Sequence, residues 1–292
     1  MSATKQLLAD AKELGFELYG ITNAEPPKHF DAFERWLKTG MHAGMTHFVR
    51  NFNARQHPKS LLPDVQSILM LGVSYTKVLN SEPPHPIQGL SGIVEYARGD
   101  DYHSWIRTRL RVLAKKHQAL FPDGRCRIAV DTAPIFEKQY AVAAGLGTIG
   151  KNTLLIHPPN GEQQFGSKFF LAAFLSTERL EPTPQPEPFD PCGECRRCLD
   201  VCPTGALCEP YILDARRCLS YWTLIHHGEL PAEIAEKRGN RFLGCDTCQS
   251  VCPHNRAVPA ISEGTFDPAL LDLGNLRLVL FGSPLQKCPA TI

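Results

Sequence analysis

The sequence predicts an α/β domain followed by a smaller cysteine-rich module. Apolar runs alternate with amphipathic segments over residues 1–180, prolines crowd residues 181–191, and two cysteine runs of similar spacing lie within 192–260. Alternation of strand-like and helix-like segments is typical of an α/β fold. With 292 residues, 43% of them hydrophobic, the chain can bury a substantial core in about two domains.

The first domain is expected to contain three buried strands and four helices. Uninterrupted apolar runs indicate strands at 67–75, 126–131 and 168–177. Amphipathic patterns indicate helices near 4–14, 29–39, 101–120 and 135–144. The 101–120 helix carries basic residues beside its apolar stripe. We interpret these as a solvated face, with an RNA contact as the alternative.

The glycines of GLGTIG, residues 145–150, match the pattern GxGxxG, which also occurs in dinucleotide-binding sites. That fingerprint follows a strand and opens a helix, whereas here a helical segment precedes the glycines and a strand-like TLLI follows them. We therefore predict a helix C-cap and a loop whose backbone closely approaches another strand or a flat cofactor.

The stretch VDTAP, residues 130–134, ends an apolar strand with polar side chains and a helix-initiating proline. Ligand sites of open α/β sheets gather at the carboxyl ends of strands. Asp131 and Thr132 are therefore candidate site residues, although either could simply cap the following helix. Both roles are compatible if Thr132 caps and Asp131 stays free.

The segment EPTPQPEPFDP, residues 181–191, places a proline at nearly every second position. Such a segment can neither join a helix nor pair inside a sheet, so we predict a linker.

After the linker, CGECRRCLDVCPTG at 192–205 shows the spacing CxxCxxCxxxCP. This spacing is typical of four-iron four-sulfur ferredoxins, in which the fourth cysteine of each run ligates the other cluster. A second run, GCDTCQSVCPHN at 244–255, lacks its first cysteine, because Phe242 stands in that place. One cluster is expected to bind Cys192, Cys195, Cys198 and Cys252, and the other Cys202, Cys245 and Cys248.

The fourth ligand of the second cluster must come from between the runs. Cys208 follows Cys202 so closely that the chain would have to fold back at once, whereas Cys218 can return on the helix that DARRCLSYW suggests. We predict Cys218. Structural zinc is the alternative for CxxC pairs, but the interlocked order and both CP dipeptides favour clusters. Cys126, Cys208 and Cys288 are then interpreted as small apolar residues.

Composition excludes several other classes of protein. The net charge of +1 gives no broad basic field for nonspecific binding of nucleic acid. No apolar run reaches the roughly twenty residues of a membrane span, and the N-terminal stretch lacks the apolar block of a secretory signal. We expect a cytoplasmic protein, in which eleven cysteines indicate metal rather than disulfides.

Taken together, the motifs resemble the epoxyqueuosine reductase family. They are YARGDDYH at 96–103, VDTAP at 130–134, AGLGTIGKN at 144–152, CGECRRCLDVCPTGAL at 192–207, RCLSYWT at 217–223 and GNRFLGCDTCQSVCPHN at 239–255. The resemblance implies an α/β (α+β) cobalamin-binding domain, distantly nitroreductase-like, before a ferredoxin-like domain with two 4Fe-4S clusters. It also implies reduction of epoxyqueuosine to queuosine at the wobble position of transfer RNA.

The resemblance further implies roles for individual residues. Asp131 is the implied proton donor, whose carboxyl must stay protonated at neutral pH through burial or neighbouring negative charge. Cys218 is the implied fourth ligand of the second cluster. The implied contacts with the corrin are Lys151, Asn152, Ser220, Asp246 and Thr247, and Arg55 is a further candidate that could instead be a surface charge.

Partners and alternatives follow from the same resemblance. The expected partners are the anticodon stem-loop and an external donor such as a flavodoxin or ferredoxin, for a monomer with no membrane contact. Residues 261–292 match no helical extension of the family, so we expect a shortened C-terminal segment with weaker RNA affinity. The alternatives are a cobalamin-dependent reductive dehalogenase, disfavoured by the missing export signal, and a two-cluster electron carrier, disfavoured by the large first domain.

Overall fold

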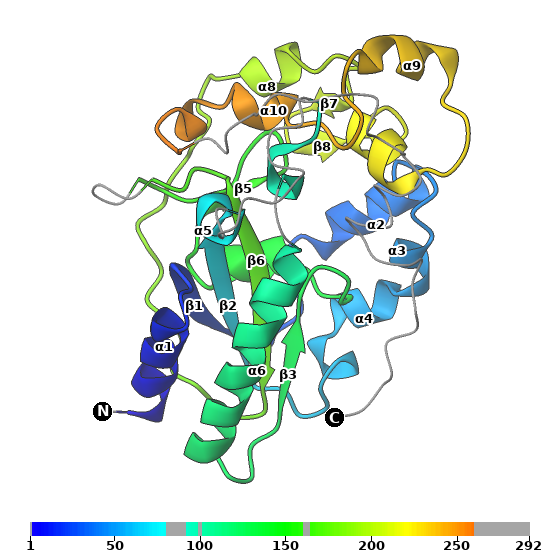
Figure 1. Ribbon diagram of the computed structural model, residues 1–292. Coiled ribbons are helices and arrows are strands. Elements are labelled where there is room, and N and C mark those ends of the chain that lie inside the picture. The colour runs from blue at the N-terminus through cyan, green and yellow to red at the C-terminus, as the bar shows by residue number, and fades with distance from the viewer. Residues whose placement is uncertain (1, 80–91, 99–100, 160–163, 260–292) are drawn as a thin grey trace.

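A four-stranded sheet organises the first domain. The computed structural model describes residues 2–79, 92–98, 101–159 and 164–259 (Figure 1). The strand order is β1-β2-β6-β3. The strands of this sheet are β1 (Leu18–Asn23), β2 (Ser67–Ser74), β3 (Cys126–Ala129) and β6 (Phe169–Ser176).

Every neighbouring pair of strands in this sheet is antiparallel. In the central pair, β2 and β6, the register runs from Ser67 opposite Ser176 to Ser74 opposite Phe169. The domain is therefore α+β in the strict sense. Alternation of helices and strands along the sequence suggested an α/β sheet, but alternation does not fix strand direction. Three of these strands, β2, β3 and β6, correspond to the expected strands, whereas β1 was not predicted.

The two central strands are apolar because both of their faces are covered. All eight residues of β2 are buried, and alternate side chains enter two separate hydrophobic clusters. Leu69 and Leu71 face one cluster, and Ile68 and Met70 face the other. A strand that is buried on both sides reads as a continuous apolar run, which is why the sequence revealed it so clearly.

Helices cover both faces of the sheet. On one face lie α1 (Ala3–Glu13) and the long α6 (Tyr102–Leu120), which crosses in front of the strands in Figure 1. On the other face lies α7 (Glu137–Ala143). Side-chain caps begin α1 and α6. The Ser2 hydroxyl accepts the Lys5 N–H, and the Asp101 carboxylate accepts the His103 N–H. These helices match the expected ones.

The predicted basic face of α6 is partly used inside the protein. The Arg109 guanidinium lies over the Trp105 ring at 3.4 Å, and Lys116 pairs with Asp10 on α1 at 2.8 Å. Arg111 and Lys115 are exposed, as a solvated face requires.

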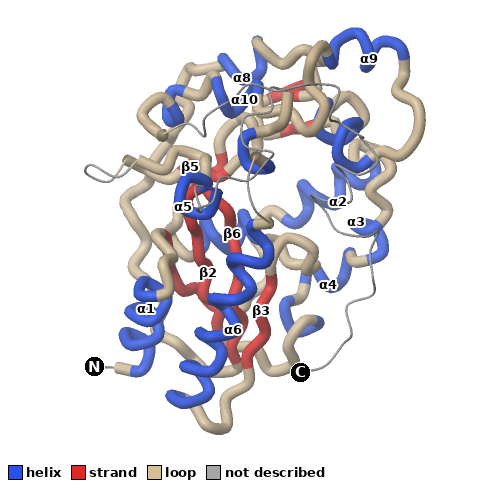
Figure 2. The backbone as a smooth tube through the Cα atoms, in the orientation of Figure 1, coloured by secondary structure: helices blue, strands red, loops and turns tan. Residues whose placement is uncertain are grey.

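The remaining elements of the first domain are short. In Figure 2 the helices among these elements are blue and the strands are red. They are α2 (Phe30–Lys38), α3 (His47–Arg50), α4 (Phe52–Gln56), η1 (Pro58–Ser60), α5 (Tyr75–Leu79), η2 (Glu95–Ala97), and the hairpin of β4 (Thr148–Ile149) and β5 (Leu155–Ile156).

The glycine loop after α7 behaves as its residues predict. Gly145 has a φ of 81° immediately after the helix cap, and Gly147 has a φ of 153°. A side chain at Gly147 would overlap the backbone of Ile156. The sequence predicted that the backbone of this loop closely approaches either another strand or a flat cofactor. In the structure it approaches strand β5 of the β4–β5 hairpin.

Residues 181–190 contain no helix or strand and run along the first domain. Thr183 exchanges bonds with β1, since its N–H donates to the Ile21 carbonyl at 3.0 Å and its hydroxyl accepts from the Ile21 N–H at 3.2 Å. This segment is therefore anchored to the domain that it leaves.

The cysteine-rich module consists of short elements around its loops. In chain order they are α8 (Arg197–Asp200), β7 (Leu207–Glu209), β8 (Ile212–Leu213), the π-helical turn η3 (Tyr221–Ile225), α9 (Ala232–Arg238), α10 (Thr247–Ser250) and η4 (Pro253–Asn255). Helices α8 and α10 lie together at the top of Figure 1. Each belongs to one cysteine run, so the sequence repeat is also a structural repeat. The predicted segment 261–292 and Cys288 lie outside the described residues.

A buried polar network joins the module to the start of β6. The Asn255 side chain accepts from the Ser167 N–H at 2.8 Å, and Gln249 donates to the Ser167 carbonyl at 2.7 Å. Nearby, the Lys168 ammonium pairs with the Glu95 carboxylate at 2.7 Å, with side chains only 9% and 7% exposed. The module therefore sits at the end of the sheet where β6 begins and β2 and β3 end.

We predict that Lys168→Met destabilises the protein by about 3 kcal/mol, because it removes the ammonium whose attraction offsets the cost of burying the Glu95 carboxylate. Denaturant unfolding of the reconstituted protein measures this loss. Lys237→Met, which removes an exposed pair with Glu233, is the control and should leave the midpoint almost unchanged. Equal midpoints for both variants would contradict a stabilising role for the Lys168–Glu95 pair.

Candidate functional site

Two groups of four thiols lie in the module. In the first group, burial and the nearby Cys192 and Cys252 thiols raise the pKa of Cys198. Burial also raises the pKa of Cys252, with Cys192 and Cys195 adding to the shift. The structure therefore brings together Cys192, Cys195, Cys198 and Cys252, the set expected for the first cluster.

The second group consists of Cys202, Cys218, Cys245 and Cys248. Burial, followed by the Cys245, Cys218 and Cys202 thiols and more weakly Cys198, raises the pKa of Cys248 to about 12. Burial likewise raises the pKa of Cys218, and Cys245 and Cys202 contribute. Among described residues, no three His, Cys, Asp or Glu side chains lie close enough to share one metal ion.

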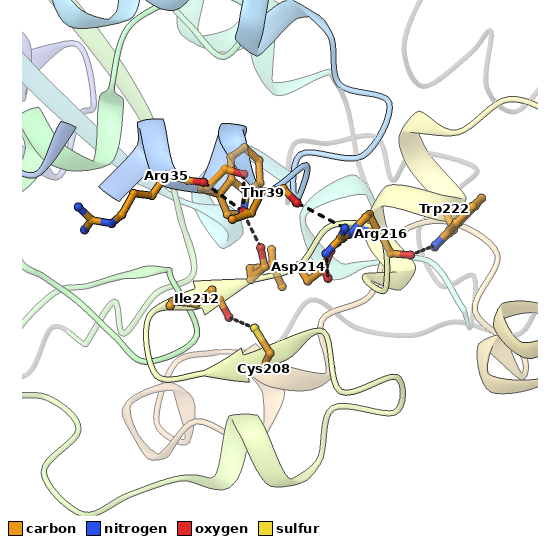
Figure 3. Close-up of polar contacts among 9 residues, drawn as sticks. Arg35, Thr39, Cys208, Ile212, Asp214, Arg216 and Trp222 are labelled. Carbon is orange, nitrogen blue, oxygen red and sulfur yellow. Dashed lines mark hydrogen bonds and ion pairs between the residues drawn. The ribbon is translucent and has the colours of Figure 1, made fainter. Parts of the chain in front are cut away.

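Cys218 and Cys208 differ sharply in position. Cys208 lies on the β7–β8 hairpin, is exposed, and directs its sulfur to the Ile212 carbonyl at 3.7 Å (Figure 3). Cys218 follows a turn after this hairpin and points into the second thiol group. The hairpin lets the chain fold back beside Cys202 while Cys208 stays outside the group.

The turn that carries Cys218 is braced against α2. The Trp36 indole donates to the Leu213 carbonyl at 2.7 Å, and the Arg216 guanidinium makes two bonds to Asp214, one of them at 2.8 Å (Figure 3). The Trp222 indole donates to the Arg216 carbonyl at 2.7 Å on the other side of Cys218. First-domain residues thereby set the position of a module cysteine.

The expected corrin contacts Lys151 and Asn152 bind the cysteine loops in this structure. The Lys151 N–H donates to the Cys192 sulfur at 3.3 Å, and its ammonium donates to the Cys195 carbonyl at 3.1 Å. Asn152 is buried and donates to the Cys248 carbonyl at 3.4 Å. One loop of the first domain thus contacts both thiol groups.

Ser220, Asp246 and Thr247 are engaged in a similar way. The Ser220 hydroxyl accepts from the Cys245 N–H at 3.1 Å, and the Thr247 hydroxyl lies 3.3 Å from the Cys245 sulfur. Asp246 accepts the Glu95 N–H at 3.2 Å. Hydrogen bonds to cluster sulfurs and their loops tune reduction potentials, so these residues suit the support of a cluster. Their predicted contact with a corrin stays a prediction.

Arg55 lies elsewhere, beside the loop that follows β3. Its guanidinium donates to the Ile135 carbonyl at 3.3 Å and lies over the Phe48 ring at 4.6 Å. Burial lowers its pKa, against the attraction of Glu137 and Asp131. Among the residues that the structure describes, its buried Nε finds no hydrogen-bond partner. A buried donor without a partner fits a ligand acceptor better than it fits a surface charge.

Asp131 stands on a strained backbone at the same loop. Its φ is 52°, a left-handed conformation that only a few non-glycine residues adopt. Its N–H donates to the Glu137 carboxylate at 3.0 Å, and its own carboxylate is 3.3 Å from the His103 ring. The side chain is 54% exposed, so the burial expected around a proton donor is not present here.

Two neighbours of Asp131 titrate unusually, and the sequence analysis identified neither. Burial and the Asp131 carboxylate raise the pKa of Glu137 to about 8. The pKa of His103 rises to about 9, because hydrogen bonds to Asp101 and Asp131 outweigh the opposing effect of burial. The sequence held a signal for His103, since an aspartate two residues before a histidine in DDYH can orient its ring.

Two family models match the chain. Residues 191–255 match the 4Fe-4S double cluster binding domain. Residues 55–132 match the family described as "Epoxyqueuosine reductase QueG, DUF1730". Two 4Fe-4S clusters are therefore the cofactors of the module, and the eight thiols remain our predicted ligands.

Curated relatives carry the same family description. The epoxyqueuosine reductase of Pseudomonas aeruginosa is 38% identical over 88% of this chain and 70% of its own length. The Escherichia coli K12 epoxyqueuosine reductase is 37% identical over 88% of this chain, which spans 66% of that relative.

Solved structures agree. The Bacillus subtilis epoxyqueuosine reductase, described with an aspartate-bearing catalytic loop swung out of the active site, matches with a TM-score of 0.75 at 31% identity, covering 89% of this chain and 68% of that one. An epoxyqueuosine reductase with an epoxyqueuosine-modified tRNA-Tyr stem loop matches with a TM-score of 0.74 at 32% identity, covering 90% and 67%.

We predict that Cys218→Ala lowers the iron content of the anaerobically reconstituted protein by up to one cluster, because it removes a thiolate from the second group. Cys208→Ala is the matched control and should retain the full iron content, since its sulfur faces a carbonyl outside the group. Iron and sulfide analysis measures both. Loss of iron from Cys208→Ala would reverse the assignment.

Proposed function

The chain belongs to the epoxyqueuosine reductase family, and on that premise we propose that it reduces epoxyqueuosine to queuosine at the wobble position of transfer RNA. The observation that carries the proposal is the shared end of the sheet, where the cysteine module meets the start of β6 and Asp131 follows β3. The cofactors that supply electrons and the residue that supplies protons would then lie at the same end of the sheet.

The reaction defines what the residues must do. Converting the epoxide into an alkene consumes two electrons and two protons and releases the oxygen as water. No side chain can supply these electrons, so cofactors must. Two 4Fe-4S clusters and cobalamin are the family's cofactors, and when bound they supply the two electrons one at a time.

The chain's own residues hold those cofactors and deliver the protons. Eight thiols in two groups suit the clusters, with N–H donors such as Lys151 and Ala206 directed at sulfurs. The unpaired Nε of Arg55 is a candidate contact for cobalamin or substrate. Lys151, Asn152, Ser220, Asp246 and Thr247 line loops next to the thiols and remain our candidates for the corrin edge.

We assign the proton transfer to Asp131. It follows β3, its backbone is held by Glu137, and its side chain is accessible. The relative from Bacillus subtilis is described with its catalytic aspartate loop swung out of the active site. An exposed Asp131 on a loop fits a residue that approaches the leaving oxygen only when substrate is bound.

The family assignment favours the reductase over the two alternatives. A reductive dehalogenase also uses such cofactors, but the strong matches are to epoxyqueuosine reductases. A simple electron carrier would not need the sheet domain or a strained aspartate beside it. Turnover of epoxyqueuosine in transfer RNA after anaerobic reconstitution with cobalamin tests the proposal directly.

Further partners are part of the proposal. We infer a one-electron donor such as a flavodoxin or ferredoxin, a monomeric enzyme and a cytoplasmic location. Among the residues that the structure describes, none of the helices combines the length and hydrophobicity that crossing a membrane requires.

Asp131→Asn should keep both clusters, cobalamin and the fold while turnover falls about a hundredfold to ten-thousandfold, the usual contribution of a general acid. Asparagine preserves the shape and tolerates the left-handed backbone, but it cannot donate an acid proton. Absorption spectra check cofactor content, and stem-loop turnover gives the rate. Turnover at the parental rate would mean that another group provides the proton.

Binding of the anticodon stem-loop should weaken steeply as salt rises, because phosphate contacts release counterions. Without a broad basic field, at a net charge of +1, we expect measurable affinity mainly at low ionic strength. Fluorescence anisotropy over a salt series gives the slope, with a stem-loop carrying unmodified guanosine as control. Tight, salt-independent binding would contradict phosphate-dominated recognition by this chain.

A further inference from the structure

Asp101, His103 and Asp131 form a chain of hydrogen bonds that reaches the proposed proton donor. The His103 Nδ1 lies 2.7 Å from Asp101 Oδ1, and its Nε2 lies 3.3 Å from Asp131 Oδ2. The His103 ring stacks against Tyr102, with centroids 4.0 Å apart, and its side chain is only 18% exposed. The ring therefore has a fixed orientation between the two carboxylates.

Asp101 also fixes which nitrogen carries a proton. It caps α6 by accepting the His103 N–H at 3.0 Å and the Ser104 hydroxyl at 3.0 Å, so its carboxylate is held in place by the helix. The hydrogen bond to the His103 ring, followed by the bonds from the His103 N–H and the Ser104 hydroxyl, lowers the pKa of Asp101 to about 2, which keeps it an acceptor. The His103 Nδ1 must then be a donor.

The contact with Asp131 requires a second proton. With Nδ1 committed as a donor, a neutral His103 would direct a lone pair at an ionised Asp131, which is repulsive. The contact is attractive when one proton lies between Nε2 and Oδ2, either as imidazolium and carboxylate or as imidazole and carboxylic acid. This axis therefore holds one transferable proton.

We propose that His103 is a positioning residue that stores this proton and returns it to Asp131 during epoxide reduction. The inference rests on the proposed function. In each transfer, the shared proton moves from His103 Nε2 to Asp131 Oδ2, and Asp131 gives it to the departing oxygen. Neutral His103 regains a proton from water. The relay thereby supplies the two protons in succession, while the electrons come from the cofactors.

The surrounding charges support storage at neutral pH. Asp101 on α6 and Asp131 after β3 face the imidazole, and Glu137 on α7 bonds the Asp131 backbone. Burial of the imidazole acts in the opposite direction, and the cations Arg55 and His47 lie near Asp131. The acidic neighbours dominate, and the pKa of His103 is raised to about 9. The stored proton should therefore be lost only as the pH rises through about 9.

Two variants separate proton storage from simple positioning. His103→Gln can still donate an amide hydrogen bond to Asp131 but cannot titrate, so single turnover by the pre-reduced holoenzyme should slow about tenfold to a hundredfold. Asp101→Asn keeps a good N-cap for α6 and removes the charge, so activity should be lost at a lower pH than in the parent. His57→Gln, at an exposed position, is the matched control.

Histidine ¹⁵N NMR of the holoenzyme with oxidised clusters gives a readout without substrate. The resonance that disappears in His103→Gln should titrate near pH 9 in the parent and at lower pH in Asp101→Asn. Titration near pH 6.5 in the parent, or a Gln variant with the parental rate and pH profile, overturns the proposal. Parental turnover of epoxyqueuosine is measured first, so failure of the proposed function itself would be distinguished.

Discussion

Eight thiols, partly or fully buried and near one another, are the constraint on which the rest of this structure depends. Burial and mutual repulsion hold the pKa values of Cys198, Cys218 and Cys248 above the ordinary range. Thiolates in such a position are costly unless iron compensates their charge and N–H donors face their sulfurs. The short helices, tight turns and CP dipeptides of the module make these groups possible, and little apolar core remains to stabilise it independently.

The first domain supplies that missing support. Its GKN loop donates to the Cys192 sulfur and to carbonyls beside other cysteines, and Ser167 joins the buried network of Gln249 and Asn255. The braced turn before Cys218 depends on Trp36 of α2. Because contacts such as those of Ser167 lie where β6 begins, the cysteine loops that would bind the clusters are held at the end of the sheet from which the Asp131 loop emerges. The same residues therefore stabilise the module and position its cysteine loops.

Sequence reasoning succeeded where one physical pattern dominates. The apolar runs of β2 and β6 are visible because both faces are buried, and the cysteine spacing pointed to the double-cluster domain that the family model matches. Sequence reasoning failed where contacts between distant segments decide whether a strand forms and in which direction it runs. Strand β1, LYGITN, is short and contains Gly20, and the antiparallel sheet direction leaves no trace in the alternation of elements. The roles of His103 and Glu137 required knowledge of which loops meet across the fold.

The strained backbone of Asp131 explains why those roles belong together. A left-handed residue directs its N–H to Glu137 and its side chain to His103, an arrangement that a relaxed extended residue would not give. Glycine would adopt this conformation at lower cost but could carry no proton. Aspartate is among the few acids that tolerate it, and the two flanking hydrogen bonds offset part of the strain. The fold thus accepts local strain to keep a protonatable group on the loop after β3, at the end of the sheet where the cysteine module sits.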